Sequence, residues 1–521
     1  MAEWCAENLR NVEGWRSSGL PLSTPSNECA KLYDAALRQF VSWADCKQLG
    51  GLEKTMEAMT AADDKAVLPR AFVLGFEAIG TVVGARTDEK MRNALEELQI
   101  DAAKYGNDRE ILHAKAVQQF AQGKHAAAAN TWELILEDYP TDLLAIKLAH
   151  DTYFYLGEAK RIRDSINAVL PKHKGTEPCY SYLHGMLAFG LEECEQYDEA
   201  EKEALKGLEA NRYDCWSTHA RAHVFEMQGR FTEGIEFLES TVEDWKQGWM
   251  LASHNYWHNA LYYIERDADY EVPLTIFDNE ICPRAVKSGA MLDLVDAVSI
   301  LWRLELEGAN VGDRWRDLPS LKEYTDSHVL FFNDIHMSIA LQRGGFNDEE
   351  AKMRESLTEF ANSASDDYTQ AKICRDVGLS IYDGLSHYIK GDYGSCAKNM
   401  VPIRDRIHTI GGSNAQTIDR VANHTDELIT DIRVTLNGTT IVVTQLGDAV
   451  TVLLDQMYKL IFYTLIILIP VICIAIILCS FACLIRSVRK QVRYIPHYRE
   501  IPLTREPFDP SKRFESIEND N

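Results

Sequence analysis

The chain has 521 residues and a formal charge of −25 at pH 7, with 46% hydrophobic and 26% charged residues. This length exceeds that of one ordinary compact domain and fits either several domains or one long repeat array. The composition excludes a mainly disordered chain, and the negative charge argues against binding nucleic acid through a basic surface.

The first 416 residues have the pattern of a helical region. Their apolar residues recur at helical spacing, and few runs alternate with a period of two, so we predict an all-α region. The first 15 residues contain three Glu and no apolar core, so no cleavable signal peptide is predicted. Twelve Cys are scattered without a CxxC pair, which is typical of reduced cytosolic thiols. We assign residues 1–105 to an N-terminal helical cap.

A repeated turn pattern follows this cap. Equivalent turn residues occur at 125, 159, 197, 231 and 270, with spacings of 34, 38, 34 and 39 residues, and Gly391-Asp392-Tyr393 resembles a further turn. A period near 34 is typical of the tetratricopeptide helix–turn–helix repeat, whose helix pairs bury their apolar faces against their neighbours. We therefore predict a tetratricopeptide-like solenoid of helical hairpins over residues 106–416. The alternative is a non-repetitive helical domain.

Several short stretches between residues 15 and 416 follow one another as in a known family. These stretches are Leu20–Glu28, Pro140–Ala145, His150–Gly157, His254–His258, Leu330–His336, Arg375–Leu379 and Gly411–Gln416. On them the chain resembles the tetratricopeptide repeat protein 38 family. The resemblance implies a tetratricopeptide-like α-solenoid and implies no particular activity.

Polar side chains on four predicted helices form a candidate binding site. Two His pairs have i, i+4 spacing, which places both members of a pair on one helix face. Because successive repeats can direct equivalent positions into one channel, we expect these side chains to share a concave surface. Two His and a carboxylate can hold Zn²⁺ or Fe²⁺. The candidate ligand-binding residues are His219, His223, Glu226, His254, Trp257, His258, Asp293, Asp296, Asp334 and His336.

Structural packing is the alternative interpretation of these residues. A zincin has Glu directly after its first His, but Ala220 and Asn255 occupy those places here. The sequence also contains no phosphate-binding loop, dinucleotide fingerprint or nucleophile elbow. We therefore predict no catalytic residues and no cofactor, and the sequence leaves the metal undetermined.

Two functions from different classes fit this organisation. The favoured one is a non-enzymatic interaction scaffold that binds a peptide or protein segment in its concave face, without nucleic acid. The alternative is a metal-dependent enzyme that uses the His/Asp cluster inside the solenoid.

The C-terminal part has a different composition. Residues 417–459 form a linker with β-branched stretches, residues 460–485 contain no charge, and residues 486–521 form a basic, polar tail. Twenty-six uncharged residues are long enough to span a bilayer, so we predict a single transmembrane helix. After Gln416 the similar family continues with helical sequence. The tail was therefore either acquired in one lineage or joined from an adjacent gene in the gene model.

The orientation of this span follows from competing signals. Five basic residues after it place the tail in the cytosol by the positive-inside rule. Asn423 and Asn437 lie in glycosylation sequons that are used if the linker is lumenal. The missing signal peptide and the free thiols favour the opposite orientation. We predict a single-pass membrane protein whose repeats are cytosolic.

Overall fold

The computed structural model describes residues 2–267, 270–318 and 324–416. Every regular element in these ranges is a helix, which confirms the predicted all-α class. The described cysteines are all free thiols. Within the same ranges, no helix is both long enough and apolar enough to cross a bilayer. The predicted linker, transmembrane helix, tail and glycosylation sites at Asn423 and Asn437 lie outside the described residues.

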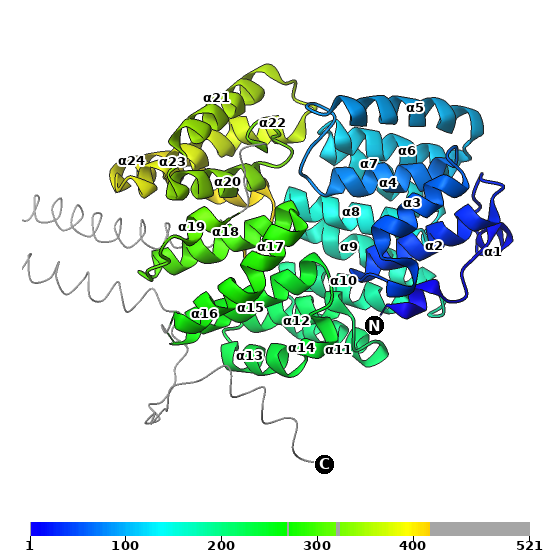
Figure 1. Cartoon of the computed structure of the whole chain (residues 1–521), viewed down its shortest axis with the longest axis horizontal. Helices are drawn as coiled ribbons and strands as arrows, with labels where there is room; N and C mark the ends of the chain where they lie inside the picture. Colours follow the sequence, from blue (N-terminus) through cyan, green and yellow to red (C-terminus); the bar gives the residue numbers. More distant parts are fainter. Residues whose placement is uncertain (1, 268–269, 319–323, 417–521) are drawn as a thin grey trace, which may run out of the picture. The chain divides into compact units, whose positions relative to one another are not determined.

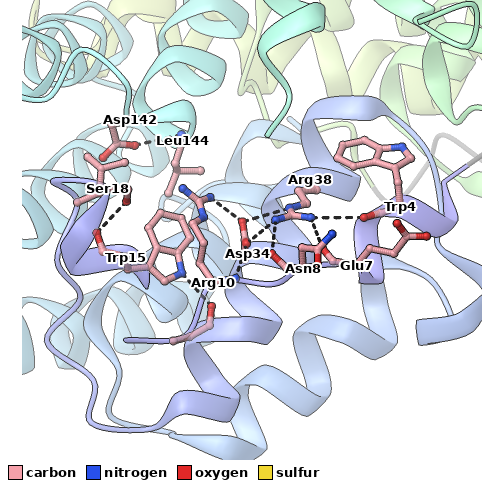
Figure 2. A network of polar contacts seen from close by, with 12 residues as sticks. Trp4, Glu7, Asn8, Arg10, Trp15, Ser18, Asp34, Arg38, Asp142 and Leu144 are labelled. Atoms are coloured by element: carbon pink, nitrogen blue, oxygen red, sulfur yellow. Dashed lines mark hydrogen bonds and ion pairs between the residues drawn. The ribbon is translucent and has the colours of Figure 1, made fainter. Parts of the chain in front are cut away.

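The N-terminal helices are joined to the preceding segment by a buried ion-pair network (Figure 2). The Asp34 carboxylate accepts hydrogen bonds from the Arg10 guanidinium at 2.6 Å and from the Arg38 guanidinium at 2.7 Å. Arg38 also donates to the backbone carbonyl of Glu7 at 2.7 Å. One buried carboxylate thus pairs with two guanidinium groups and fixes the chain end against α2. The helices of this part are α1 (Val12–Ser17), α2 (Asn27–Ser42), α3 (Leu52–Ala62), α4 (Val67–Ile79) and α5 (Glu89–Tyr105).

Helical hairpins then follow one another along the chain (Figure 1). The predicted turns near residues 125, 159, 197 and 231 separate the two helices of successive pairs, and this part of the prediction is confirmed. Paired helices are α6 (Asp108–Ala121) with α7 (His125–Asp138), α8 (Leu143–Leu156) with α9 (Ala159–Val169), α10 (Tyr180–Glu193) with α11 (Tyr197–Ala210), and α12 (Cys215–Met227) with α13 (Phe231–Ser240).

The later part of the chain is less regular but still helical. A short α14 (Val242–Trp245) precedes α15 (Met250–Asp267), and the turn between α23 and α24 lies at the predicted Gly391–Tyr393. The remaining helices are α16 (Glu271–Ile276), the π-helix η4 (Phe277–Ile281), α17 (Cys282–Ser288), α18 (Met291–Leu306), α19 (Arg314–Asp317), α20 (Phe331–Gly344), α21 (Asn347–Ser363), α22 (Thr369–Ile373), the π-helix η6 (Cys374–Gly378), α23 (Leu379–Ile389), α24 (Tyr393–Met400) and the 3₁₀ helix η7 (Val401–Ile410).

The first helices of the hairpins pack directly against one another. Contacts connect α10 with α12, α12 with α15, α15 with α18, and α18 with α20. These helices are buried on nearly all sides, including polar residues such as His223 and Asn255. A helix in this layer contacts its own partner helix, the preceding hairpin and the following one, so few of its positions reach solvent.

The end of the described chain returns to this inner layer. Gly412 donates its backbone N–H to the Phe154 carbonyl of α8, and the Asn414 N–H donates to the Glu193 carboxylate of α10 at 3.1 Å. The guanidinium of Arg303 on α18 donates to the Ala415 carbonyl at 2.7 Å. Residues 411–416 are therefore held against three helices that are distant in sequence. The predicted boundary between the cap and the solenoid at residue 105 stays a prediction.

Candidate functional site

Four buried histidines meet where α12 packs against α15. They are His219, His223, His254 and His258. One ring nitrogen from each lies within 4.8 Å of the corresponding nitrogen of every other member. The Nε2 atoms of His219 and His223 are 2.9 Å apart. The i, i+4 spacing aligns each pair on its helix, and the contact between the two helices brings the pairs together. We call these four residues the His cluster.

Two carboxylates contact the outer nitrogens of the His cluster. The Nδ1 of His254 lies 2.8 and 2.9 Å from the two oxygens of Asp296, which projects from α18. The Nδ1 of His223 lies 3.3 Å from Glu192 of α10. When Nδ1–H faces a carboxylate, the Nε2 lone pair is directed away from it. In His254 this places the Nε2 lone pair on the side of the cluster, whereas the approach of His223 to Glu192 is not a hydrogen bond within the described residues.

Burial sets the protonation state of these imidazoles. Burial, reinforced by the neighbouring imidazoles, holds the pKa values of His219, His223 and His258 well below the ordinary value. The rings are therefore neutral at pH 7, which is the form that binds a metal ion. Burial raises the pKa of Glu192 to about 8; a hydrogen bond with Glu193 reduces the rise and the Glu226 carboxylate adds to it.

A small cavity adjoins one side of the His cluster. Its volume is about 80 Å³, and its walls come from the inner helices α8, α10, α12, α15 and α18, from the end of α2 and from residues 411–416. His258 is not among its lining residues, so the cavity reaches the cluster from the side of the other three histidines. The residues used below are Trp43, His150, Asp151, Phe189, Trp216, Leu292 and Ser413.

Several other predicted residues lie beside the cluster without belonging to it. The Trp257 ring stacks on His254 at a centroid distance of 4.9 Å and donates its Nε1–H to Ser299. Glu226 is buried on α12, close enough to Glu192 to affect its pKa. Asp293 accepts a hydrogen bond from Ser288 at 2.5 Å, and burial raises the pKa of Asp293 to about 6.

The structure does not bring Asp334 and His336 into the His cluster. Asp334 lies 3.2 Å from the Nδ1 of His328, whose Nε2 lies 2.9 Å from Ser356. The Nδ1 of His336 donates to the Phe332 carbonyl one turn earlier in α20. Their predicted helix is present, but their side chains make local contacts there.

Sequence reasoning missed residues that the structure places at the site. His150 and Phe189 line the cavity at repeat positions equivalent to that of His223. Residues 150, 189, 223, 258 and 296 follow one another at intervals of 34 to 39 residues, which match the spacing of the hairpins. Extending the repeat phase by two hairpins would have found both residues. Glu192 and Glu193 end α10 and have no local signal, since acidic residues are common at helix surfaces.

The fold defines this chain as an all-α protein built of successive helical hairpins. No protein-family model matches it. A solved structure similar to it is that of the human IFIT1 dimer with PPP-AAAA, which is 16% identical in sequence. The match covers 77% of this chain and 98% of that one, with a TM-score of 0.31. Similarity of this extent carries no argument about the site.

Proposed function

We propose that the His cluster is a binding centre for a divalent transition-metal ion, in a helical-hairpin protein whose function depends on that ion. The observation that carries the proposal is the convergence of four buried imidazoles whose ring nitrogens lie within 4.8 Å of one another. Imidazole suits Zn²⁺, Fe²⁺, Cu²⁺ and Ni²⁺, and neutral His binds these ions through its lone pair.

Metal binding also explains polar groups that packing leaves without a function. Both ring nitrogens of His258 and the Nδ1 of His219 are buried and make no hydrogen bond within the described residues. A buried polar atom without a partner costs about 1–3 kcal/mol. A bound cation would convert one lone pair of His258 into a ligand bond, so it offsets part of this cost.

The distances and surrounding groups fit such an ion. Tetrahedral Zn²⁺ with Zn–N bonds of about 2.0–2.1 Å separates its ligand nitrogens by about 3.3 Å. The 2.9 Å between the Nε2 atoms of His219 and His223 therefore needs only a small ring rotation. Asp296 occupies the outer-shell position that orients a metal-binding imidazole and increases its basicity.

The interaction-scaffold hypothesis remains a proposal of a different kind. A peptide in the inner layer at the His cluster would compete with residues 411–416, which already contact α8, α10 and α18 there. The metal centre is thus the function that the geometry of this face favours.

We also propose, from the sequence stretches alone, that the chain is a relative of the tetratricopeptide repeat protein 38 family and is anchored through residues 460–485.

The test measures the metal content of the full chain, purified without chelator, by inductively coupled plasma mass spectrometry. We expect about one transition-metal ion per chain, reduced at least tenfold in His258→Ala. His336→Ala is the matched control, because His336 is equally buried but lies outside the cluster. Metal-free protein of intact helicity that takes up neither Zn²⁺ nor Fe²⁺ would refute the proposal.

A second variant distinguishes two ligand sets. Glu192, Glu193 and His223 also lie within 4.8 Å of one another and could hold a cation by themselves. His223→Ala removes a ligand from both sets, whereas His258→Ala affects only the His cluster. Full metal content in His258→Ala with loss in His223→Ala would assign the ion to the carboxylate set.

A further inference from the structure

The cavity beside the His cluster contains buried polar atoms directed at no protein partner. His150 is 2% exposed and Ser413 is 3% exposed, and both line the cavity. Neither ring nitrogen of His150 nor the Ser413 hydroxyl makes a hydrogen bond within the described residues. Buried polar atoms are nearly always satisfied, so their arrangement around one cavity points to a ligand with polar atoms of its own.

The walls between these polar atoms are aromatic. Trp216 packs edge-on against His150 at a centroid distance of 5.2 Å, and Phe189 lies 5.2 Å from both His219 and His223. An apolar wall next to a metal centre favours a ligand whose body is apolar and whose donor atom reaches the ion.

An ion pair adjoins the cavity at Asp151. The Asp151 carboxylate pairs with the Lys147 ammonium, which is fully buried and lies 4.1 Å from the centre of the Trp43 ring. Asp151 and Asp296 both line the cavity. Lys147 balances the charge of Asp151, so an anion in this wall would be repelled by Asp296, whereas a neutral molecule can donate a hydrogen bond to either carboxylate.

The size of the cavity limits its occupant. An apolar cavity of about 150 Å³ is large enough for benzene. The cavity here measures about 80 Å³, so it admits a molecule smaller than benzene, such as a five-membered azole or a short alcohol.

We propose that this cavity is a ligand pocket that brings a small, neutral molecule with an apolar body and one nitrogen or oxygen donor to the metal ion. The inference rests on the proposed metal centre and extends it, because it makes the ion accessible on its His219, His223 and His254 side. Structural metal sites are closed by protein ligands, whereas catalytic sites keep a position open for water or substrate. Because four imidazoles already complete a tetrahedral shell, the donor atom of the small molecule would reach the ion as a fifth ligand from the cavity side.

The test uses the full chain loaded with Co²⁺, whose visible absorption reports its coordination, and pyrazole as the neutral probe. We expect pyrazole to change the Co²⁺ spectrum saturably and acetate to act at least tenfold more weakly. In Leu292→Trp, which fills the pocket from α18, Co²⁺ should still bind while the response to pyrazole falls at least tenfold. Ser413→Val narrows the wall formed by residues 411–416 and serves as the second variant if Leu292→Trp does not fold.

The outcomes separate this inference from the proposal on which it rests. Bound Co²⁺ whose spectrum pyrazole leaves unchanged would show a closed structural ion, which overturns the pocket and keeps the metal centre. An equal response to acetate would overturn the neutral class of ligand. A pyrazole response that both filled variants retain would place the ligand elsewhere. Failure of the folded chain to bind Co²⁺ would refute the metal centre itself.

Discussion

Replacing Asp296 by Asn tests whether its carboxylate supports a metal ligand. Both of its oxygens lie within 2.9 Å of the His254 Nδ1, and Asn keeps one acceptor of the same size at that place. The hydrogen bond and the ring tautomer can therefore survive while the negative charge is lost. A protein in which Asp296 only fills space would tolerate this change without any effect on metal affinity.

The expected magnitude follows from the role of the carboxylate. Mutation of an outer-shell partner typically lowers metal affinity by about 10–100-fold, which equals about 1.4–2.7 kcal/mol at 25 °C. Asp296 is buried, so solvent weakens its effect on His254 less than at an exposed site. We expect Asp296→Asn to fall within this range and His254→Ala to exceed it, because the latter removes a ligand.

Competition with a chromophoric chelator for Zn²⁺ measures these affinities directly. Asp334→Asn is the matched control, since it makes the same change at another buried Asp–His pair outside the His cluster. The control should keep the affinity of the natural protein, and circular dichroism should show equal helicity in all variants. If Asp296→Asn and Asp334→Asn bind Zn²⁺ with the same affinity, the assignment of Asp296 to the outer shell is wrong.

Three further predictions concern stability and topology. Burial lowers the pKa of His125, packed against Phe120, to about 4, so its contribution to stability is complete above pH 6.5 and is lost as the pH falls towards 4. The unfolding free energy of the natural protein should fall by about 2 kcal/mol between pH 7.5 and pH 5 because of His125, and His125→Phe should abolish this fall in urea unfolding. An unchanged pH dependence in the variant would contradict this prediction. Asp34→Ala leaves two partly or fully buried guanidiniums without their carboxylate and should lower the unfolding free energy by about 3–5 kcal/mol, whereas a loss below about 1 kcal/mol would show that water replaces it. Endoglycosidase should leave the mobility of the full chain unchanged if the repeats are cytosolic, and a shift abolished by replacing Asn423 and Asn437 with Gln would show a lumenal linker.

Local patterns were sufficient to predict the helices and much of the site. The i, i+4 spacing of His219 with His223, and of His254 with His258, determines which side chains share a helix face before any tertiary contact is known. The repeat period then predicts that the two faces are neighbours, and α12 does contact α15. Both steps depend only on short-range geometry that repeats along the chain.

The rest of the site depends on contacts between distant parts of the sequence. Ser413 reaches the cavity because residues 411–416 return to helices that precede them by more than a hundred positions, and no periodic pattern encodes that return. The prediction that Asp334 and His336 join the cluster is wrong because of local contacts rather than distant ones. Their chemistry fits the repeat pattern, but His328 and the Phe332 carbonyl lie closer and take up their hydrogen bonds.

The location of the His cluster follows from the architecture of the helical hairpins. The first helix of each hairpin contacts neighbours on several sides, so a polar residue on it is shielded from water and must find its partner inside the protein. Such a layer can hold neutral imidazoles close together only because burial suppresses their protonation, as the lowered pKa values of His219, His223 and His258 indicate. A surface cluster of four histidines would gain protons and separate as the pH falls. The inner layer therefore supplies both conditions that a metal centre needs, namely fixed positions and available lone pairs.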